Sequence, residues 1–414
     1  MERKETIIVG AGQAGLATSY CLQQRGREHL VFEQASTPAP VWRNERWDSF
    51  TMVTPNWTLN LPGAAYDGPE PDGFTTRAGI TDYFDRYVQD NRLPVQCNTQ
   101  VTAVREQNGK GFEVDIHDRT YLADNVVIAT GYDQQPSIPE AAKSISLDIT
   151  QLHSSRYRNP ESLPSGGVLV VGTAQSGAQI AEELYQSGRK VFLSVSNAGR
   201  APRRYRGQDV FKWLFQMGFF DLPPDKMPGP PGGKFVPPHI SGKGGGRTLN
   251  LHQFTRDGVT LLGHFAGADG HTVSLAPDLH AGLARADGFE AMGKQMIDGY
   301  IAAAGIDAPE EELPQLRDGY EQPIIERLDL GQEGITTIVW ATGFRHDYGI
   351  VKLPVTDEKG NPIQDRGVSR YRGLYFVGMP WMPTLKSVLL ASVGEFASEI
   401  ASTIAARDLA VATA

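Results

Sequence analysis

The chain has 414 residues, which is long enough for two domains that each bury a core. With 40% hydrophobic and 21% charged residues and a mean hydropathy of −0.32, it has the composition of an ordinary globular protein. A formal net charge of −9 argues against a nucleic-acid partner, which would need a clustered basic face. No apolar run approaches the roughly 18 residues of a membrane span, and the first residues enter a strand without an apolar signal segment. We therefore expect a cytoplasmic protein without a membrane partner.

Cysteine usage excludes one class of flavoenzyme. Cys21 and Cys97 are the only cysteines, and they form neither a C-x-x-C nor a C-x4-C pair. Two isolated cysteines indicate a reducing compartment rather than a disulfide scaffold. A flavin–dithiol reductase needs a redox-active pair, so the sequence excludes that chemistry. The sequence also predicts no metal site.

The opening residues predict one βαβ unit. Ile7–Val9 is an apolar strand, the loop spans residues 10–15, and a helical pattern continues to about Gln24. Gly26 suits the turn that ends a helix, and Leu30–Glu33 has the pattern of the second strand.

Glycines at three positions of this loop point to a bound dinucleotide. In the G-x-G-x-x-G pattern, the first glycine allows the tight turn, the second lets a pyrophosphate approach, and the third lets the helix pack on the strand. The helix N-terminus offers N–H groups and a partial positive charge to the phosphates. An acid at the end of the second strand accepts hydrogen bonds from the ribose, so the spacing favours a nucleotide site over ordinary turn glycines. The residues predicted to bind are Gly10, Gly12, Gln13, Ala14, Gly15, Glu33 and Gln34.

The following segment predicts fewer regular elements. Residues 40–63 are rich in proline and aromatic residues, and we expect them to be irregular and to pack on a ligand. Residues 79–92 have the pattern of an amphipathic helix. Alternating residues around Asn108-Gly109 and Asp118 predict a small antiparallel meander, which leads into a buried strand at Asn125–Ala129.

The βαβ pattern occurs a second time from residue 166. Residues 166–196 again give a strand, a glycine loop, a helix and a strand, and 335–344 repeat the strand and turn of 125–132. Repetition of a whole unit indicates two nucleotide-binding domains rather than a solenoid. The sequence therefore predicts an α/β fold with two Rossmann-like domains.

The second loop differs from the first at its middle position. It has Gly172 and Gly177 but also Ala174, whose methyl group is tolerated if the loop stands slightly further from the phosphate or contacts it through water. No acid ends the second strand, and arginines follow instead, as expected for a site that accepts the 2′-phosphate of NADPH. A solvated basic patch is the alternative. The residues predicted to bind are Gly172, Ala174, Gln175, Ser176, Ser196, Arg200, Arg203 and Arg204.

Two segments between the repeats carry no nucleotide motif. Residues 223–246 contain seven prolines and seven glycines, so we expect a long loop or lid without regular structure. The apolar stretch 209–222 is expected to be a core or dimer-interface helix, with the wall of a substrate channel as the alternative. Aromatic residues at 42, 47, 57, 211, 213 and 215 fit either a pocket or the core.

This combination of motifs resembles the class B flavoprotein monooxygenases from about residue 5 to residue 400. Two dinucleotide loops, two A-T-G turns and the lack of a cysteine pair carry the resemblance. The linker at 147–160 is similar to the family's F-x-G-x-x-x-H-x-x-x-Y motif. His153 and Tyr157 match it, whereas Leu147 and Ile149 replace the phenylalanine and the glycine.

The resemblance implies FAD at the first site and NADPH at the second. The NADPH-binding domain, 159–332, would be inserted into a discontinuous FAD-binding domain formed by 1–158 and 333–414. Trp42 and Arg43 match the family's W-R pair beside the flavin, although alanine and proline replace the two preceding glycines. Further residues implied to contact a cofactor are Val101, Ala129, Thr130, Gly131, Tyr157, Ala341, Thr342, Gly343, Gly378, Lys386 and Ser387.

The resemblance also assigns roles near the C-terminus and in the linker. Gly378 would let the chain pass the flavin tail, and a helix starting near Lys386-Ser387 would point its positive end at the flavin's N1–C2=O edge. The alternative is an amphipathic C-terminal helix with a structural role only, and the two interpretations are compatible. His153 is expected to be structural or to contact NADP rather than to act as a general base.

The implied activity is an NADPH- and FAD-dependent monooxygenase that inserts one oxygen atom from O2 into a small organic substrate through a flavin C4a-hydroperoxide. One departure concerns the segment facing the flavin: the family has T-N-T-P, and this chain has Met52-Val53-Thr54-Pro55, with Asn56 able to reach in from the next turn. The catalytic candidates are Val53, Thr54, Asn56 and Lys386.

Two other functions stay open at this stage. Because Val53 replaces an amide, an uncoupled NADPH oxidase or NADPH:acceptor reductase is the first alternative. A non-catalytic flavin-binding redox sensor is the second. The expected partners are a small-molecule substrate and O2, and a homodimer is left open.

Overall fold

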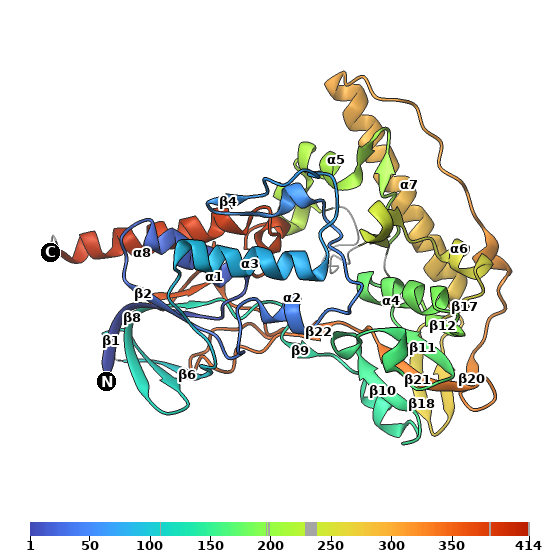
Figure 1. The fold of residues 1–414 in the computed structure, drawn as a ribbon, viewed down its shortest axis with the longest axis horizontal. Helices are drawn as coiled ribbons and strands as arrows, with labels where there is room; N and C mark the ends of the chain where they lie inside the picture. Colours follow the sequence, from blue (N-terminus) through green and yellow to red (C-terminus); the bar gives the residue numbers. More distant parts are fainter. Residues whose placement is uncertain (108, 196, 198, 228–237, 381, 413–414) are drawn as a thin grey trace.

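Two lobes, each built on its own β-sheet, make up the molecule (Figure 1). The computed structural model describes residues 1–107, 109–195, 197, 199–227, 238–380 and 382–412. Because two sheets of the nucleotide-binding type are present, the predicted α/β fold with two Rossmann-like domains is confirmed.

The first lobe has a nine-stranded mixed sheet in the order β23-β24-β25-β8-β1-β2-β5, with β6 and β7 attached to β8. Its centre is parallel: β1 (Glu2–Val9) lies between β2 (His29–Phe32) and β8 (Thr120–Ile128), and β25 (Leu374–Phe376) pairs with β8. The antiparallel β6-β7-β8 pairing confirms the predicted meander. The other strands are β5 (Val95–Gln96), β6 (Val101–Glu106), β7 (Phe112–Ile116), β23 (Gln364–Asp365) and β24 (Val368–Ser369).

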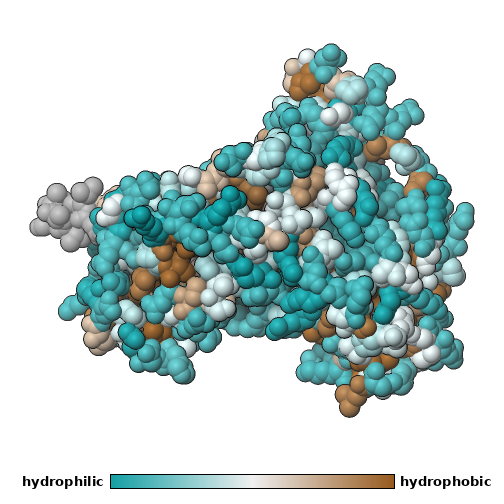
Figure 2. Space-filling model, in the orientation of Figure 1, coloured by the Kyte–Doolittle hydropathy of each residue, from teal (hydrophilic) through white to brown (hydrophobic). Residues whose placement is uncertain are grey.

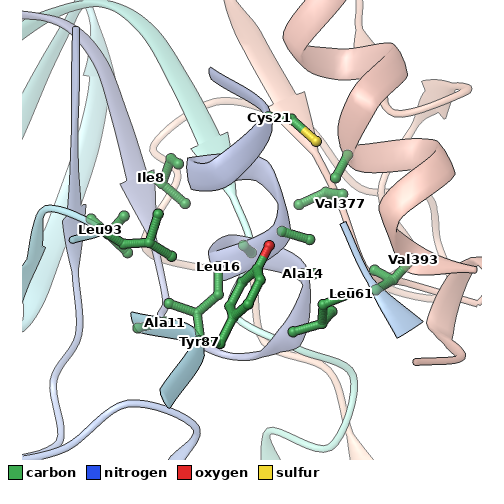
Figure 3. Close-up of a cluster of buried hydrophobic side chains, with 14 of the residues drawn as sticks. Ile8, Ala11, Ala14, Leu16, Cys21, Leu61, Tyr87, Leu93, Val377 and Val393 are labelled. Atoms are coloured by element: carbon green, nitrogen blue, oxygen red, sulfur yellow. The ribbon is translucent and has the colours of Figure 1, made fainter. Parts of the chain in front are cut away.

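Alternate residues of this sheet face two different layers, as the two-residue period of a strand requires. Ile8 faces a layer of three helices, whereas Ile7 faces the meander. The helices are α1 (Gln13–Gln23), α3 (Arg77–Asn91) and α8 (Val393–Ala412). Figure 3 shows how α1 is enclosed by side chains from the sheet, α3 and α8, so the helix after the first glycine loop cannot shift independently.

The second lobe repeats this arrangement on a smaller scale. Its five-stranded sheet is parallel throughout, in the order β10-β21-β11-β12-β17. The helix α4 (Gln175–Gln186) follows β11 (Gly167–Val171), as α1 follows β1. The other strands of the sheet are β10 (Thr150–His153), β12 (Val191–Ser194), β17 (Thr260–Leu262) and β21 (Ile335–Trp340).

Two strands belong to a different sheet from the one implied by the predicted domain limits. The limits 1–158 and 333–414 assign β10 and β21 to the first lobe, but both strands lie in the second sheet, where β21 pairs with β11. The reason is the backbone: β21 closes the second βαβ unit and finds its parallel hydrogen-bonding partner in β11. The other domain boundaries stay a prediction.

The chain crosses between the lobes in two segments that pair with each other. The strand β9 (Gln135–Pro136) leads from the first sheet towards the second, and β22 (Phe344–Arg345) leads back. Phe344 pairs with Pro136, and Arg345 with Gln135, in antiparallel register. A two-stranded ribbon therefore connects the lobes.

Three predicted segments differ in detail from the structure. The helix expected near Lys386-Ser387 begins instead at Val393, because a 3-10 turn (η9, Leu385–Val388) comes first. Within 223–246, residues 228–237 lie outside the described part of the chain, but β15 (Ile240–Ser241) pairs with β16 (Arg247–Thr248), so regular structure is present there. Residues Pro40–Asn44 form a short helix, α2, since proline is tolerated in a first turn.

The apolar stretch 209–222 forms α5 (Val210–Gln216) and a 3-10 turn, η5 (Phe219–Asp221). Phe211 and Trp213 are buried in a cluster shared with the long helix α7 (Leu279–Ala304), which confirms the core interpretation for these two residues. The remaining short elements are α6 (Leu251–Arg256), β3 (Asn60–Leu61), β4 (Ala64–Ala65), β13 (Arg204–Tyr205), β14 (Gln208–Asp209), β18 (Phe265–Asp269), β19 (Thr272–Leu275) and β20 (Arg327–Asp329).

The surface drawn in Figure 2 is mainly hydrophilic, with hydrophobic residues in small separate patches. Of the helices in the described part of the chain, none has both the length and the apolar character that a bilayer span needs.

Replacement of Gly378 by alanine should destabilise the first lobe. Gly378 has φ +76°, and an added Cβ would lie 2.3 Å from the Cβ of Ala14 in α1. The left-handed backbone alone costs a side chain about 1–2 kcal/mol, so we expect a clear loss of unfolding free energy in denaturant titration. The matched control is Gly299→Ala in α7, where nothing lies within 4 Å of an added Cβ. That change should stabilise the protein by about 0.5–1 kcal/mol, and equal effects of the two changes would contradict the packing argument.

Candidate functional site

The first glycine loop is shaped by two contacts that exclude side chains. Gly10 has φ +106°, and an added Cβ would lie 2.5 Å from the carbonyl oxygen of Ala129. A Cβ on Gly15 would lie 1.9 Å from the carbonyl oxygen of Gly10. These distances are far below van der Waals contact, so both positions require glycine for the turn and for the packing of α1 on β1.

Gly12 meets open space instead. Nothing lies within 4 Å of a Cβ built on Gly12, and its φ of −78° is one that any residue adopts. Gly12 is the N-cap of α1, so the open space lies where the N–H groups of the first helical turn are free. A pyrophosphate fits this cradle in shape and charge.

Glu33 ends the neighbouring strand beside the same loop. Its carboxylate is only 4% exposed and accepts hydrogen bonds from the backbone N–H groups of Ala11 (2.8 Å) and Ala35 (2.9 Å). Two backbone donors hold the carboxylate in place while leaving further lone pairs for ribose hydroxyls. The neighbouring Gln34 is exposed.

The second glycine loop repeats the geometry of the first. Gly172 has φ +102°, and an added Cβ would lie 2.6 Å from the carbonyl oxygen of Ala341. A Cβ on Gly177 would lie 1.9 Å from the carbonyl oxygen of Gly172. Ala174, with φ −61° and ψ 176°, has nearly the backbone of Gly12, with φ −78° and ψ −176°. The alanine is therefore compatible with an intact loop, and its methyl group occupies the position that is open at Gly12.

The A-T-G turns lie against these loops in the same way in both lobes. The N–H of Ala129 donates to the carbonyl of Val9, and the N–H of Ala341 donates to the carbonyl of Val171. In the second turn the Thr342 hydroxyl donates to the carbonyl of Ser137. The turns thus form one wall of each loop. Thr130, Gly131 and Gly343 follow in the same turns, and Gln175 and Ser176 start α4.

The end of the second βαβ unit has no counterpart of Glu33. The hydroxyl of Ser194 at the end of β12 donates to the carbonyl of Gly263 (2.9 Å). The predicted contact Ser196 lies outside the described residues.

Two of the three arginines predicted to bind the 2′-phosphate form ion pairs with carboxylates of the protein instead. Arg200 is 5% exposed and forms ion pairs with Asp287 and Glu290, both at 2.8 Å. Arg203 is 2% exposed and forms a bidentate ion pair with Asp209. The prediction is therefore corrected for both residues, because carboxylates of the protein already pair with both guanidinium groups.

Arg204 is exposed and differs in its partners. Its guanidinium donates to the carbonyls of Gly245 (2.9 Å) and Gly246 (3.4 Å). Both acceptors are neutral, so the charge of Arg204 is available to an anion.

The linker residues matched by the motif bind within the second lobe. His153 is buried, its Nε2 donates to the carbonyl of Gly343 (3.0 Å), and its Nδ1 accepts from the N–H of Ser155 (3.2 Å). Burial lowers the pKa of His153, so the ring is neutral and holds the second A-T-G turn. The buried Tyr157 was predicted to contact a cofactor, but its hydroxyl donates to Glu183 on α4 (2.8 Å) and is thereby used within the protein.

Of the catalytic candidates at 53–56, Val53 and Thr54 lie outside regular elements, and Asn56 begins a 3-10 turn, η1 (Asn56–Thr58). The Thr58 hydroxyl donates to that of Thr54 (2.8 Å), and the Asn56 amide donates to the carbonyl of Glu70 (2.9 Å). The Asn56 side chain is thereby held by its own loop. The carbonyl of Val53 accepts a hydrogen bond from Arg203 (2.6 Å), a contact that the sequence did not predict.

The other flavin-side candidates have different surroundings. Trp42 packs against the hydrophobic cluster around α1 in the first lobe and the one around α4 in the second. Arg43 forms an ion pair with Asp85 (2.7 Å). Val101 begins β6 and is buried.

At the C-terminal element, burial alone would lower the pKa of Lys386, but ion pairs outweigh it and raise the pKa. The partners are Asp221 (2.5 Å) and Glu395 (2.8 Å). The Ser387 hydroxyl donates to the carbonyl of Met379 (2.6 Å), so Lys386 and Ser387 both use their side chains to fix the turn before α8.

Sequence reasoning missed two contacts of this region. The side chain of Gln13 donates to the carbonyl of Val388 (2.6 Å), which ties α1 to η9 across most of the chain length. Asp209 was not expected to partner Arg203. The five residues between them carry no motif, and only the β13-β14 pairing brings them together.

Comparison with known proteins agrees with this geometry. The family model for pyridine nucleotide-disulphide oxidoreductases matches residues 7–214, half of the chain. An uncharacterized oxidoreductase CzcO-like from Geobacillus kaustophilus is 32% identical, over 94% of this chain and 95% of that protein. A probable indole-3-pyruvate monooxygenase, YUCCA1 of Arabidopsis thaliana, is 30% identical over 50% of each chain. A flavin-containing monooxygenase from Stenotrophomonas maltophilia has a similar fold, with a TM-score of 0.66, 21% identity and coverage of 98% of this chain and 99% of that chain.

The chain belongs to the pyridine nucleotide-disulphide oxidoreductase family. Family membership makes the chain an oxidoreductase, which agrees with the predicted enzyme class. Both cysteines are free, Cys21 lies in the core, and burial raises the pKa of the Cys21 thiol to about 11. A buried thiol of this kind is unreactive, so the structure offers no dithiol pair despite the family's name.

Replacement of Gly12 by valine should remove the flavin while leaving the fold intact. Its φ of −78° accepts a β-branched residue, and the added side chain would enter the open space in front of α1. We expect a folded, colourless protein by circular dichroism and visible absorbance. Gly15→Ala is the contrasting variant, because its Cβ clashes with backbone and should damage folding itself. Full FAD occupancy in Gly12→Val would refute the assignment of this loop.

Proposed function

We propose that the protein is an NADPH- and FAD-dependent monooxygenase that transfers one oxygen atom from O2 to a small organic molecule. The proposal rests mainly on one observation: two glycine loops of equal geometry, only one of which is followed by a buried carboxylate. Glu33 suits the adenosine ribose of FAD, and its absence in the second lobe suits a 2′-phosphate. The similarity to the YUCCA1 protein supports the reaction class.

Residues of the two loops would hold the cofactors. The cradle in front of Gly12 would take the FAD pyrophosphate, and the one in front of Ala174 that of NADPH. A flavin bound there would supply the redox chemistry that links NADPH to O2. The protein's own contribution would be to align the two nucleotides and exclude water, and the neutral His153 holds the Gly343 turn beside the second loop.

An uncoupled NADPH oxidase or NADPH:acceptor reductase is the second candidate. Val53 favours it, since the apolar side chain offers no amide, and the Asn56 amide is bound to Glu70 within its own loop. A non-catalytic redox sensor is disfavoured by the second nucleotide loop. The location in the cytoplasm and the homodimer stay predictions.

Rapid kinetics on the flavin-loaded protein separates these candidates. The protein is reduced by NADPH without oxygen and then mixed with oxygenated buffer while visible spectra are recorded. A monooxygenase should give a species that is neither reduced nor oxidised flavin before the oxidised spectrum returns. Direct return with stoichiometric hydrogen peroxide would favour the oxidase, and failure of NADPH to bleach the flavin would favour the sensor.

Arg204→Ala should weaken the preference for NADPH. The exposed guanidinium of Arg204 has only neutral acceptors among the hydrogen bonds described for it, so it can pair with a 2′-phosphate. One charge-assisted contact is worth about 1.5–3 kcal/mol, so we expect the KM for NADPH to rise about tenfold or more with little change in the KM for NADH. Steady-state oxidation of both nucleotides provides the measurement, and an equal rise for both would refute the role.

A further inference from the structure

Arg203 of the second lobe reaches into the first lobe. Its Nη1 donates to the backbone carbonyl of Val53 (2.6 Å), while its other guanidinium nitrogens bind Asp209 in a bidentate ion pair. The guanidinium also lies over two aromatic rings, at 4.5 Å from the ring centroid of Phe74 and 5.4 Å from that of Phe211. Five donors in a rigid plane, stacked on aromatic rings, leave the side chain little freedom.

The hairpin of β15 and β16 closes over the same segment. A Cβ on Gly242 would lie 1.9 Å from the carbonyl oxygen of Met52, and one on Gly246 would lie 2.5 Å from the Phe74 ring. Of two consecutive carbonyls of the first lobe, that of Val53 thus accepts a hydrogen bond from Arg203, and that of Met52 lies so close to Gly242 that no side chain fits between them. The N–H of Arg203 in turn donates to the hydroxyl of Thr248 on β16, so the hairpin and the arginine form one unit.

The segment held in this way begins in the hydrophobic core that also contains the first glycine loop. Met52 is buried in the same hydrophobic cluster as Ala11 and Ala14, which belong to the loop and to the first turn of α1. Figure 3 shows Ala11 and Ala14 in this cluster beside Leu16 and Tyr87. A displacement of Met52 therefore disturbs the core that includes Ala11 and Ala14.

We propose that Arg203 is a positioning residue, which fixes from the other lobe the backbone of Met52–Pro55, the segment that the resemblance places on the flavin side of the first site. The proposal rests on the assignment of FAD to the first loop under the proposed function. Arg203 acts through the Val53 carbonyl and does not contact a reacting atom. The bidentate pair with Asp209 makes lysine a poor substitute, since an ammonium group cannot bind both carboxylate oxygens and the Val53 carbonyl in the same plane.

The test compares Arg203→Lys with Arg206→Lys in the flavin-loaded protein. Arg206 lies in the turn between β13 and β14, close to Arg203 in sequence, and forms an ion pair with Asp298 (2.8 Å), so it controls for the loss of an arginine ion pair. For Arg203→Lys we expect bound FAD with a shifted visible spectrum and a limiting rate of flavin reduction at least about tenfold lower. The apparent Kd for NADPH should stay within twofold of wild type, and Arg206→Lys should match wild type in all three quantities.

A second variant covers the case in which Arg203→Lys does not fold. Arg203→Met combined with Asp209→Asn removes both buried charges and leaves neither unpaired, and the same spectral and kinetic changes are expected. If the variants bind FAD and equal Arg206→Lys in spectrum and limiting rate, the positioning role is refuted. If wild type itself binds no FAD, the proposed function fails instead, so the two failures are distinguishable.

Discussion

Close backbone approach between each glycine loop and the A-T-G turn beside it is the constraint on which the site depends. Side chains on Gly10 or Gly172 would overlap the carbonyls of Ala129 or Ala341. This contact brings the N-terminus of a helix to the carboxyl end of a parallel sheet, where the phosphates of a dinucleotide find unpaired N–H groups. Because the contact occurs once in each lobe, the chain has two such places.

Differences between the lobes then come from charge rather than from backbone shape. The first loop has the buried carboxylate of Glu33, held by two backbone N–H groups, and the second has no acid at the end of β12. The arginines of the second lobe divide into two kinds. Arg200 and Arg203 are buried and paired with carboxylates, whereas Arg204 faces solvent. This division leaves one arginine for an anionic ligand and uses another to hold the opposite lobe.

The sequence predicted the parts of the fold that local patterns determine. The two βαβ units and the meander were predicted because glycine spacing, apolar strands and helix-ending glycines are local signals. The sequence-based prediction failed where contacts distant in sequence determine the structure. The strand β21 pairs with β11, which lies more than 160 positions earlier. The helix α8 starts later than predicted because the turn stabilised by Ser387 precedes it. The glycine-loop residues of both candidate sites could be predicted, but the fate of Arg203 could not. Its partner Asp209 is specified by a hairpin register, and its contact with Val53 by the packing of one lobe on the other.

The central claim is that two equivalent loops bind different nucleotides. Measuring cofactor binding by the Ala174→Val variant tests this claim most directly. The φ of −61° at Ala174 accepts valine, so the fold should persist while the larger side chain fills the second cradle. Titration of the purified variant with NADP⁺, beside its FAD content, should show one FAD per chain and binding of NADP⁺ weakened about tenfold or more, equivalent to about 1.4 kcal/mol. Loss of FAD, or NADP⁺ binding equal to wild type, would contradict the account.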